Sequence, residues 1–206
     1  MKQTSLFSNS YTKIPLVSKD GSVNYYPDFL NENQSNALFG QLKRQLPWQQ
    51  RSIRIFGRQV LQPRLLYFAG NTNRAKIVYS YSGDSLTAHQ WPVEIQQLAE
   101  CISSLVQVQF NTVLINYYRD GNDSMGWHAD DEPQLGHNPP IASLTLGAKR
   151  VFKLRHKDGE THSFSLQSGS LLMMEGCLQH FWKHALPKSR KIKQGRINLT
   201  FRKIIN

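Results

Sequence analysis

The sequence predicts an α+β fold, mainly β, in which two N-terminal helices buttress an antiparallel sandwich or barrel. Two observations predict it. Apolar residues recur at helical spacing in two segments before residue 110, and from Asn111 onward short strand-like segments alternate with glycine-containing turns. Helices that precede a strand-rich half are expected to cover one face of its sheet. The length of 206 residues fits one domain with a small N-terminal addition.

Two helices are predicted in the N-terminal half, after a segment with little pattern. Residues 1–24 lack periodicity and are expected to form a flexible N-terminal arm. A first helix is predicted from Glu32 to Leu46, because leucines recur every four residues there and Pro47 ends the pattern. A second helix is predicted from Pro92 to Leu105, since proline suits a first turn and the segment carries one apolar stripe.

Between these helices, residues 51–60 are predicted to form two short strands around a turn at Gly57. An apolar tip, Ile55 and Phe56, lies between two arginines at that turn. The sequence leaves two interpretations open. Phe56 packs into the core, or it forms an apolar wedge between basic arms, as in proteins that distort DNA.

A further strand is predicted over residues 77–83, with Tyr79 and Tyr81 on one face. Paired aromatic side chains can stack on a nucleic-acid base. They can equally pack across neighbouring strands, and the pattern alone favours packing.

The C-terminal half is predicted to consist of strands, because apolar and alternating residues occur there in short runs separated by turns. The predicted strands cover residues 112–118, 141–146, 151–155, 171–174, 181–184 and 196–203. In the first of them Leu114, Asn116 and Tyr118 share one face.

The charge predicts a polyanionic partner, since the net charge is +11 and the pI is near 9.8. Residues 33–83 hold eight Lys or Arg and no acid, and residues 183–206 again hold eight and no acid. This favours nucleic acid over a membrane surface, because the basic stretches are not amphipathic helices with bulky apolar faces. Nothing resembles a signal peptide or a membrane span, and the two cysteines make no disulfide framework, so an intracellular protein is expected.

A candidate metal site lies in the segment Gly126–Glu132. His128 and Asp130 are two residues apart, so on an extended segment their side chains point to the same face. One more histidine would complete the two-histidine, one-carboxylate set of non-heme Fe(II) oxygenases. Alone, the pair is a weak signal. The spacing does not choose the third ligand between His180 and His184.

The last predicted strand alternates cleanly: Ile197, Leu199 and Phe201 face one way, and Arg196, Asn198, Thr200 and Arg202 face the other. The polar face lies either in water or inside a cavity. In a cavity the two guanidiniums would need partners, because burying an unpaired charge is costly. They then predict a dianionic ligand, since a guanidinium fork matches a carboxylate. Asn116 and Tyr118 are suited to complete such a pocket.

The His-x-Asp motif, a later histidine and the segment from Arg196 to Arg202 together resemble the AlkB family of Fe(II)- and 2-oxoglutarate-dependent dioxygenases, and within it the group acting on double-stranded DNA. The resemblance runs from about Tyr25 to Ile204. It implies a double-stranded β-helix, or jelly-roll, core of antiparallel sheets over residues 111–206. A nucleotide-recognition lid and the buttressing helices would occupy residues 25–110, in one compact catalytic domain.

The resemblance also implies roles for the matching residues. The metal and catalytic set is His128, Asp130 and His184. The 2-oxoglutarate set is Asn116, Tyr118, Arg196, Asn198, Thr200 and Arg202. The substrate set is Ile55, Phe56 and Gly57 of a duplex-invading finger, with Arg64, Tyr79, Tyr81, Ser82, Asp131 and Glu132 around the extruded base. The chain departs from the family pattern at Ala129 and Lys183, which leaves substrate preference open.

The implied activity is DNA repair by direct reversal, in which N1-methyladenine and N3-methylcytosine are oxidatively demethylated. Fe(II) would be the cofactor, 2-oxoglutarate and O2 the co-substrates, and formaldehyde, succinate and CO2 the products. The expected partner is double-stranded DNA with a flipped base, with single-stranded DNA or RNA as alternatives, and a monomer without membrane contact is expected. An RNA or tRNA demethylase and a non-catalytic nucleic-acid-binding protein are the competing hypotheses. The expected location is the cytoplasm, at the nucleoid in a bacterium, or the nucleus in a eukaryote.

Overall fold

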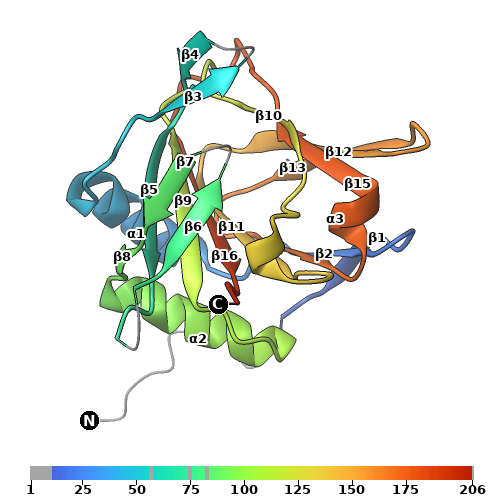
Figure 1. Ribbon diagram of the computed structural model, residues 1–206, viewed down its shortest axis with the longest axis horizontal. Helices are drawn as coiled ribbons and strands as arrows, with labels where there is room; N and C mark the ends of the chain where they lie inside the picture. The colour runs from blue at the N-terminus through green and yellow to red at the C-terminus, as the bar shows by residue number, and fades with distance from the viewer. Residues whose placement is uncertain (1–10, 56–57, 74–75, 82–83, 206) are drawn as a thin grey trace.

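Two sheets packed face to face form the core of the molecule (Figure 1). The computed structural model describes residues 11–55, 58–73, 76–81 and 84–205. The large sheet has the strand order β1-β2-β14-β11-β16-β9-β5-β8, and the small sheet has the order β10-β15-β12-β13. The paired strands are antiparallel apart from the short parallel pair β5 and β8. The predicted α+β, mainly β, jelly-roll fold is confirmed.

The large sheet consists of β1 (Ile14–Val17), β2 (Ser22–Tyr26), β5 (Leu65–Gly70), β8 (His89–Gln90), β9 (Thr112–Tyr118), β11 (Ile141–Gly147), β14 (Leu171–Glu175) and β16 (Arg196–Arg202). The small sheet consists of β10 (Met125–His128), β12 (Arg150–His156), β13 (Thr161–Leu166) and β15 (Trp182–Leu186). Two separate hairpins are formed by β3 (Ser52–Ile55) with β4 (Arg58–Leu61) and by β6 (Val78–Tyr81) with β7 (Asp84–Thr87). The helices are α1 (Glu32–Gln45), α2 (Val93–Val106), the short α3 (Leu178–Phe181) and the single 3₁₀ turn η1 (Pro133–Leu135).

The helices α1 and α2 cover the outer face of the large sheet, as predicted (Figure 1). α1 begins with a capping box, in which the Asn31 side chain accepts a hydrogen bond from the backbone of Gln34 and the Gln34 side chain accepts one from the backbone of Asn31. The apolar stripe of α2 is buried in one hydrophobic cluster with residues of β9, β11 and β16. No helix in the described part of the chain is long and apolar enough to cross a membrane.

The central strands β9 and β16 separate the apolar cluster under the helices from a polar interior. On β16, Ile197, Leu199 and Phe201 belong to the cluster shared with the helices. The alternate residues therefore point between the two sheets. The antiparallel register places Asn116 opposite Asn198 and Tyr118 opposite Arg196. Two neighbouring strands thus present a matched set of polar groups to the interior, which confirms the predicted alternation.

The expectation of a flexible arm over residues 1–24 is wrong for its second half. Residues 14–17 and 22–26 form β1 and β2 at one edge of the large sheet, and β2 pairs with β14. Val23 is fully buried between the sheets, which supplies the free energy that orders this segment. Residues 1–10 lie outside the described part of the chain. His156 is buried, with its Nε2 atom 3.0 Å from the Asp20 carboxylate in the turn between β1 and β2.

Candidate metal and co-substrate site

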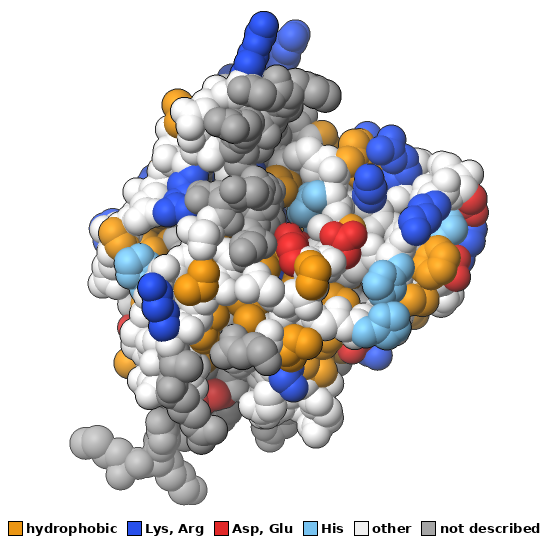
Figure 2. Space-filling view, in the orientation of Figure 1, with side chains coloured by type: hydrophobic (Ala, Val, Ile, Leu, Met, Phe, Trp, Pro, Cys, Tyr) orange, Lys and Arg blue, Asp and Glu red, His pale blue; other side chains and the backbone are white. Residues whose placement is uncertain are grey.

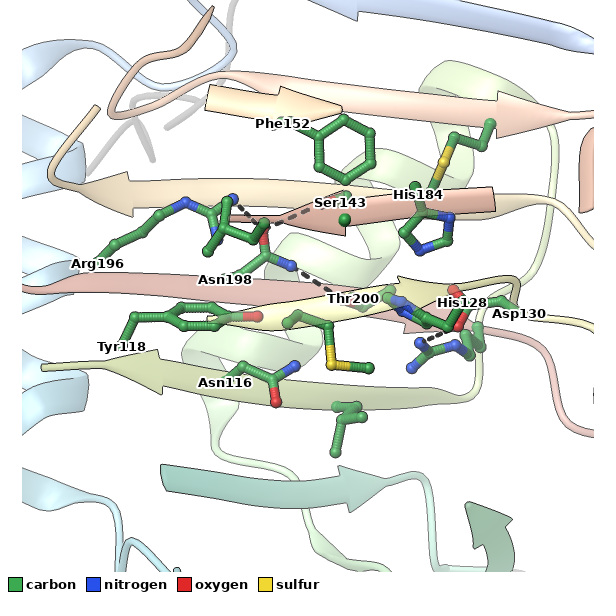
Figure 3. Close-up of a pocket in the computed structure, with 16 residues that line it drawn as sticks. Asn116, Tyr118, His128, Asp130, Ser143, Phe152, His184, Arg196, Asn198 and Thr200 are labelled. Carbon is green, nitrogen blue, oxygen red and sulfur yellow. Dashed lines mark hydrogen bonds and ion pairs between the residues drawn. The ribbon is translucent and has the colours of Figure 1, made fainter. Parts of the chain in front are cut away.

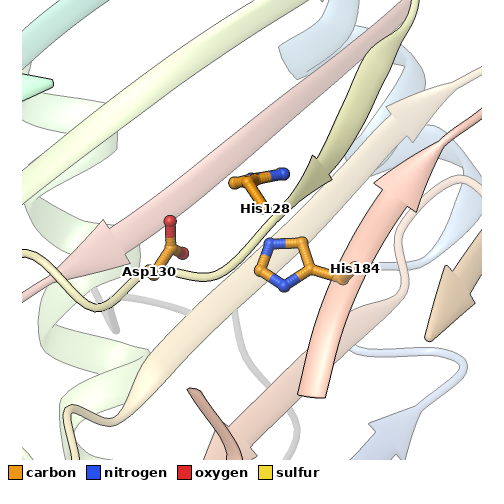
Figure 4. Close-up of side chains that lie close together, drawn as sticks. All are labelled: His128, Asp130 and His184. Atoms are coloured by element: carbon orange, nitrogen blue, oxygen red, sulfur yellow. The ribbon is translucent and has the colours of Figure 1, made fainter. Parts of the chain in front are cut away.

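Three side chains converge where the small sheet faces the end of β16. His128 is the last residue of β10, Asp130 follows it, and His184 lies in the middle of β15. Because β10 and β15 are paired, His128 lies directly opposite His184. Their ligand atoms and an Asp130 oxygen all lie within 4.8 Å of one another, and Figure 4 shows the three side chains pointing toward a common centre. His180 lies apart on α3, in a tilted contact with His137 at 5.1 Å between ring centroids.

Both histidines are held in the form that binds a metal. The Nδ1 atom of His128 is 2.9 Å from the Gly126 carbonyl oxygen. A carbonyl only accepts hydrogen bonds, so Nδ1 carries the proton and Nε2 keeps its lone pair. Burial lowers the pKa of His128, and burial together with the neighbouring His128 lowers the pKa of His184 to about 3. Neutral imidazoles are what a divalent cation requires.

Asp130 supplies the anionic ligand. Its Oδ1 atom accepts a 2.8 Å hydrogen bond from Arg202, and its backbone N–H donates to the Gln179 side chain at 2.9 Å. Burial alone would raise the pKa of this carboxyl group, but Arg202 and the two histidines outweigh it and lower the pKa to about 2. The second oxygen, Oδ2, is buried and has no hydrogen-bond partner in the described part of the chain. A buried carboxylate oxygen without a donor, beside two imidazole nitrogens, fits a metal ion.

The neutral state of His184 predicts a loss of stability in mild acid. An unfolded chain protonates this histidine near pH 6.5, whereas the folded chain does so only near pH 3. Between these values the unfolded state binds the extra proton, so stability falls as the pH falls. At pH 5 this one residue is expected to lower the free energy of unfolding by about 2 kcal/mol relative to pH 8. Urea unfolding of the metal-free protein at both pH values measures the difference.

The control for this measurement compares two substitutions. His184→Phe removes the titrating group and should lose about 2 kcal/mol of the pH dependence, while His137→Phe, at an exposed position, should keep it. An equal pH dependence in the wild type and in His184→Phe would show that His184 is not buried in its neutral form. The Asp130 carboxylate does not contribute in this window, because its stabilising effect is lost only as the pH falls below about 4 toward its folded pKa of about 2.

A second group of polar residues lies deeper in the same cavity, along β16 and β9 (Figure 3). Arg196 donates hydrogen bonds to Thr145 at 2.8 Å and to Asn198 at 2.5 Å. Asn198 in turn donates to Thr200 at 2.9 Å. Together with Asn116 and Tyr118, every residue of the predicted 2-oxoglutarate set lines this one cavity, which it shares with His128, Asp130 and His184.

The cavity has more buried positive charge than its own acids neutralise. Arg196 and Arg202 are 2% and 4% exposed, and among the described residues the only buried carboxylate that lines the cavity with them is that of Asp130. The Nε atom of Arg196 is buried without an acceptor among the described residues, and burial lowers its pKa to about 10. Arg202 likewise has two buried nitrogens, Nε and Nη1, without acceptors in the described chain. Unsatisfied buried guanidiniums of this kind fit a dicarboxylate ligand.

The predicted substrate residues lie in different surroundings, some beside the metal ligands and others in the core. Glu132 and Asp131 follow the metal ligands, with Glu132 half-buried beside Tyr79 and Asp131 exposed. Tyr79 is fully buried, with its ring 5.7 Å from that of Phe68, so it packs in the core as well as bordering Glu132.

Arg64 does not reach the surface. It is buried, and its Nε atom donates to the Asn116 side chain at 2.9 Å. This bond turns the Asn116 carbonyl oxygen away and leaves its amide N–H groups for the cavity. Ile55 ends β3, opposite Arg58 of β4. Phe56, Gly57, Ser82 and the side chain of Tyr81 lie outside the described part of the structure.

Several residues of the site were not singled out from the sequence. Ser143 donates to Asn198 at 3.1 Å, and Thr145 accepts from Arg196. Their alternation with Ala142, Leu144 and Leu146 on β11 was the available signal for a polar inner face. Gln179, which holds the Asp130 backbone, gave no local signal, because its role depends on the packing of α3 against the segment after β10.

A jelly roll that carries two histidines and one carboxylate above a pocket with two buried arginines defines a non-heme iron oxygenase of the 2-oxoglutarate type. The comparisons with known proteins agree. Residues 22–202 match the model of the 2OG-Fe(II) oxygenase superfamily. The chain is 34% identical to the DNA oxidative demethylase ALKBH2 of Arabidopsis thaliana, over 88% of its own length and 66% of the relative's. It is 34% identical to human DNA oxidative demethylase ALKBH2, over 87% of this chain and 72% of the relative.

The chain is also 35% identical to human alpha-ketoglutarate-dependent dioxygenase alkB homolog 3, over 87% of this chain and 65% of the relative. The solved structure of OsALKBH1 has the same fold, with a TM-score of 0.65 at 15% identity, covering 92% of this chain and 100% of that one. The chain therefore belongs to the 2OG-Fe(II) oxygenase superfamily and, within it, to the AlkB family. It spans about two thirds of the length of the relatives it matches first.

Proposed function

We propose that the chain is an Fe(II)- and 2-oxoglutarate-dependent dioxygenase that removes methyl groups from alkylated bases in DNA. One observation carries the proposal: a single buried cavity is lined by three convergent metal ligands and by Arg196, whose Nε atom has no acceptor among the described residues. The AlkB relatives support the choice of substrate, because two of them are named DNA oxidative demethylases. The net charge of +11 supports a polyanionic partner and leaves little reason to choose a free metabolite or a protein.

The side chains of the site would divide the work. His128, Asp130 and His184 would hold Fe(II) from one side. Arg196 would bind one carboxylate of 2-oxoglutarate, and Arg202, anchored on Asp130, would lie near the other. Bound iron with its co-substrates supplies the oxidation that lets an N-methyl group leave as formaldehyde, with succinate and CO2 as the other products.

The protein also has to admit a base and exclude water. We propose N1-methyladenine and N3-methylcytosine as targets, flipped out of the stack. A methyl group on the pairing edge weakens the base pair, so extrusion costs less at a lesion than at a normal base. Asp131 and Glu132, which follow the metal ligands in the chain, would accept hydrogen bonds from a cationic methylated base. The basic stretches over residues 43–76 and 188–196 would hold the phosphate backbone without reading its sequence.

Formaldehyde release from a methylated oligonucleotide with Fe(II) and 2-oxoglutarate tests the activity. We expect turnover by the wild type, and loss of at least about 1000-fold in His128→Ala, since an open metal site with two ligands cannot hold the iron. His137→Ala is the matched control, because it removes an exposed histidine outside the ligand set and should keep full activity. No turnover on any methylated oligonucleotide, or unchanged turnover by His128→Ala, would overturn the proposal.

The same assay with duplex DNA, single-stranded DNA and RNA measures the strand preference. We propose double-stranded DNA as the preferred form, on the basis of the apolar Ile55 and Phe56 tip between basic residues of the sequence. A faster reaction on RNA would favour the alternative, an RNA demethylase with the same metal centre. We further propose that the protein works as a monomer in the cytoplasm, at the nucleoid in a bacterium, or in the nucleus of a eukaryote.

A further inference from the structure

The outer face of the small sheet carries a basic and aromatic surface on the side opposite the metal ligands. Residues directly opposite each other in an antiparallel pair share a face. Leu154 lies opposite His184 on the inner side, so Arg155 and Lys183, which are also opposite each other, lie on the outer side. Lys153 is two residues from Arg155 on the same outer side. Trp127 precedes the inward-pointing His128 and lies over Arg155, so it belongs to this outer face.

We name the surface formed by Trp127, Lys153, Arg155 and Lys183 the outer basic face. Trp127 is 38% exposed, which is unusual for a residue with so large an apolar side chain. The guanidinium carbon of Arg155 lies 4.5 Å from the centre of the Trp127 ring, so the cation covers one face of the indole. One side of the ring is covered, and part of its surface stays open to solvent.

The positive charge of the outer basic face is not neutralised by the protein. None of its three cations takes part in a salt bridge within the described residues. The nearest acids along the hairpin, Asp158 and Glu160, are both bonded to Lys19. On the adjoining strand β13 the residues opposite Lys153 and Arg155 are Ser163 and Thr161, which add hydroxyl groups and no charge. The face is therefore flat, basic and able to donate hydrogen bonds.

The outer basic face shares the edge strand β10 with the metal ligand His128. β10, which carries both Trp127 and His128, is an edge strand of the small sheet. Gly126 on this edge is exposed, and a methyl group added there would meet nothing within 4 Å, so the edge is open. Figure 2 shows Lys and Arg side chains over the region of β12 and β15, beside the acidic and histidine side chains near the centre of the view. A nucleic-acid strand that extends from the metal site would reach the outer basic face by passing over the edge strand β10.

We propose that the outer basic face binds the unpaired nucleic-acid strand that flanks the target base, an inference that rests on the proposed function. Phosphates lie along Lys153, Arg155 and Lys183, and one flanking base stacks on the open surface of Trp127. A polyanion matches the uncompensated charge, and the exposed ring selects an unpaired base, because paired bases offer no free face to an aromatic side chain. This assignment gives a use to Lys183, at which the chain departs from the AlkB pattern.

Fluorescence anisotropy with a labelled, unmodified 15-nucleotide thymidine strand tests the proposal on the full chain. Lys153→Ser/Lys183→Ser should weaken binding and reduce the slope of log affinity against log salt by about 1.4, since each phosphate contact on a single strand contributes about 0.7. Trp127→Ala should weaken binding by roughly 5- to 150-fold, the loss of one stacked base. Lys13→Ser/Lys203→Ser is the charge-matched control, because both lysines are exposed and lie outside the face.

Equal losses in the test and control pairs, or no loss in either test variant, would overturn the proposal. An equal loss on a 15-base-pair duplex in Trp127→Ala would overturn the assignment to an unpaired strand. The test stays readable if the proposed demethylation fails, because it needs no lesion, no iron and no turnover. Conversely, turnover on a methylated trinucleotide should be unchanged in these variants, since so short a substrate does not reach the outer basic face.

Discussion

Replacing Asp130 with asparagine is expected to abolish iron binding while the chain stays folded. The Oδ2 atom of Asp130 is buried without a hydrogen-bond partner among the described residues, next to two neutral imidazoles. An amide in its place removes the single anionic ligand, and its N–H₂ group cannot bind a cation. The loss of affinity should exceed the roughly 10- to 100-fold that follows removal of groups behind the ligands. An anaerobic Fe(II) titration measures it.

The Asp130→Ala variant separates the metal-binding role from the structural one. In the alanine variant the Arg202 guanidinium loses its 2.8 Å partner inside the protein, and an unpaired buried charge is expected to cost about 3–5 kcal/mol of unfolding free energy. In the asparagine variant the amide oxygen still accepts from Arg202, so the loss should be smaller. Urea unfolding of both variants, without metal, compares them. Wild-type iron affinity in Asp130→Asn would show that this residue is not a ligand.

The candidate site shows which parts of a structure a sequence can predict. The alternation along residues 196–202 was predictable, because a strand places successive side chains on opposite faces and the apolar set had to face the core. Whether the polar set lies in water or in a cavity stayed open, and the family resemblance supplied its roles in binding 2-oxoglutarate. The choice of His184 over His180 did not follow from spacing. It depends on the register of β10 against β15, which pairs residues 56 positions apart in the chain, and the family resemblance was needed to make it.

The parts that were missed depend on contacts distant in sequence. β1 and β2 are short, and what fixes them in the sheet is the pairing of β2 with β14, more than 140 residues later, with β1 pairing in turn with β2. Arg64 was expected around the extruded base; it follows the β3–β4 hairpin into the interior, where it bonds to Asn116. This contact joins the region expected to hold substrate to the pocket expected to hold the co-substrate. Local periodicity cannot show such a link, since it reports which face is buried and not which groups meet there.

Replacing Arg196 with methionine is expected to remove 2-oxoglutarate binding without destabilising the free protein. Arg196 is 2% exposed, its Nε atom lacks an acceptor in the described chain, and no carboxylate pairs with it. Exchange of such a group for an apolar side chain of similar length is often neutral or stabilising. With the co-substrate bound, the same guanidinium would form a buried charge pair, and its loss should cost about 2–5 kcal/mol of binding free energy.

Arg150 offers a matched control for this experiment, because it is equally buried but its two terminal nitrogens donate three hydrogen bonds to backbone carbonyls. It donates to the backbone carbonyls of Asp120, Asp123 and Pro187, so Arg150→Met leaves three acceptors unpaired and should destabilise the chain. Urea unfolding with and without 2-oxoglutarate, in the presence of Mn(II) to prevent turnover, distinguishes the Arg196→Met variant from the Arg150→Met variant. The ligand should stabilise wild type and Arg150→Met but not Arg196→Met. If Arg196→Met were still stabilised to the wild-type extent, a different cation would have to bind the dicarboxylate, and Arg202 would be the next to test.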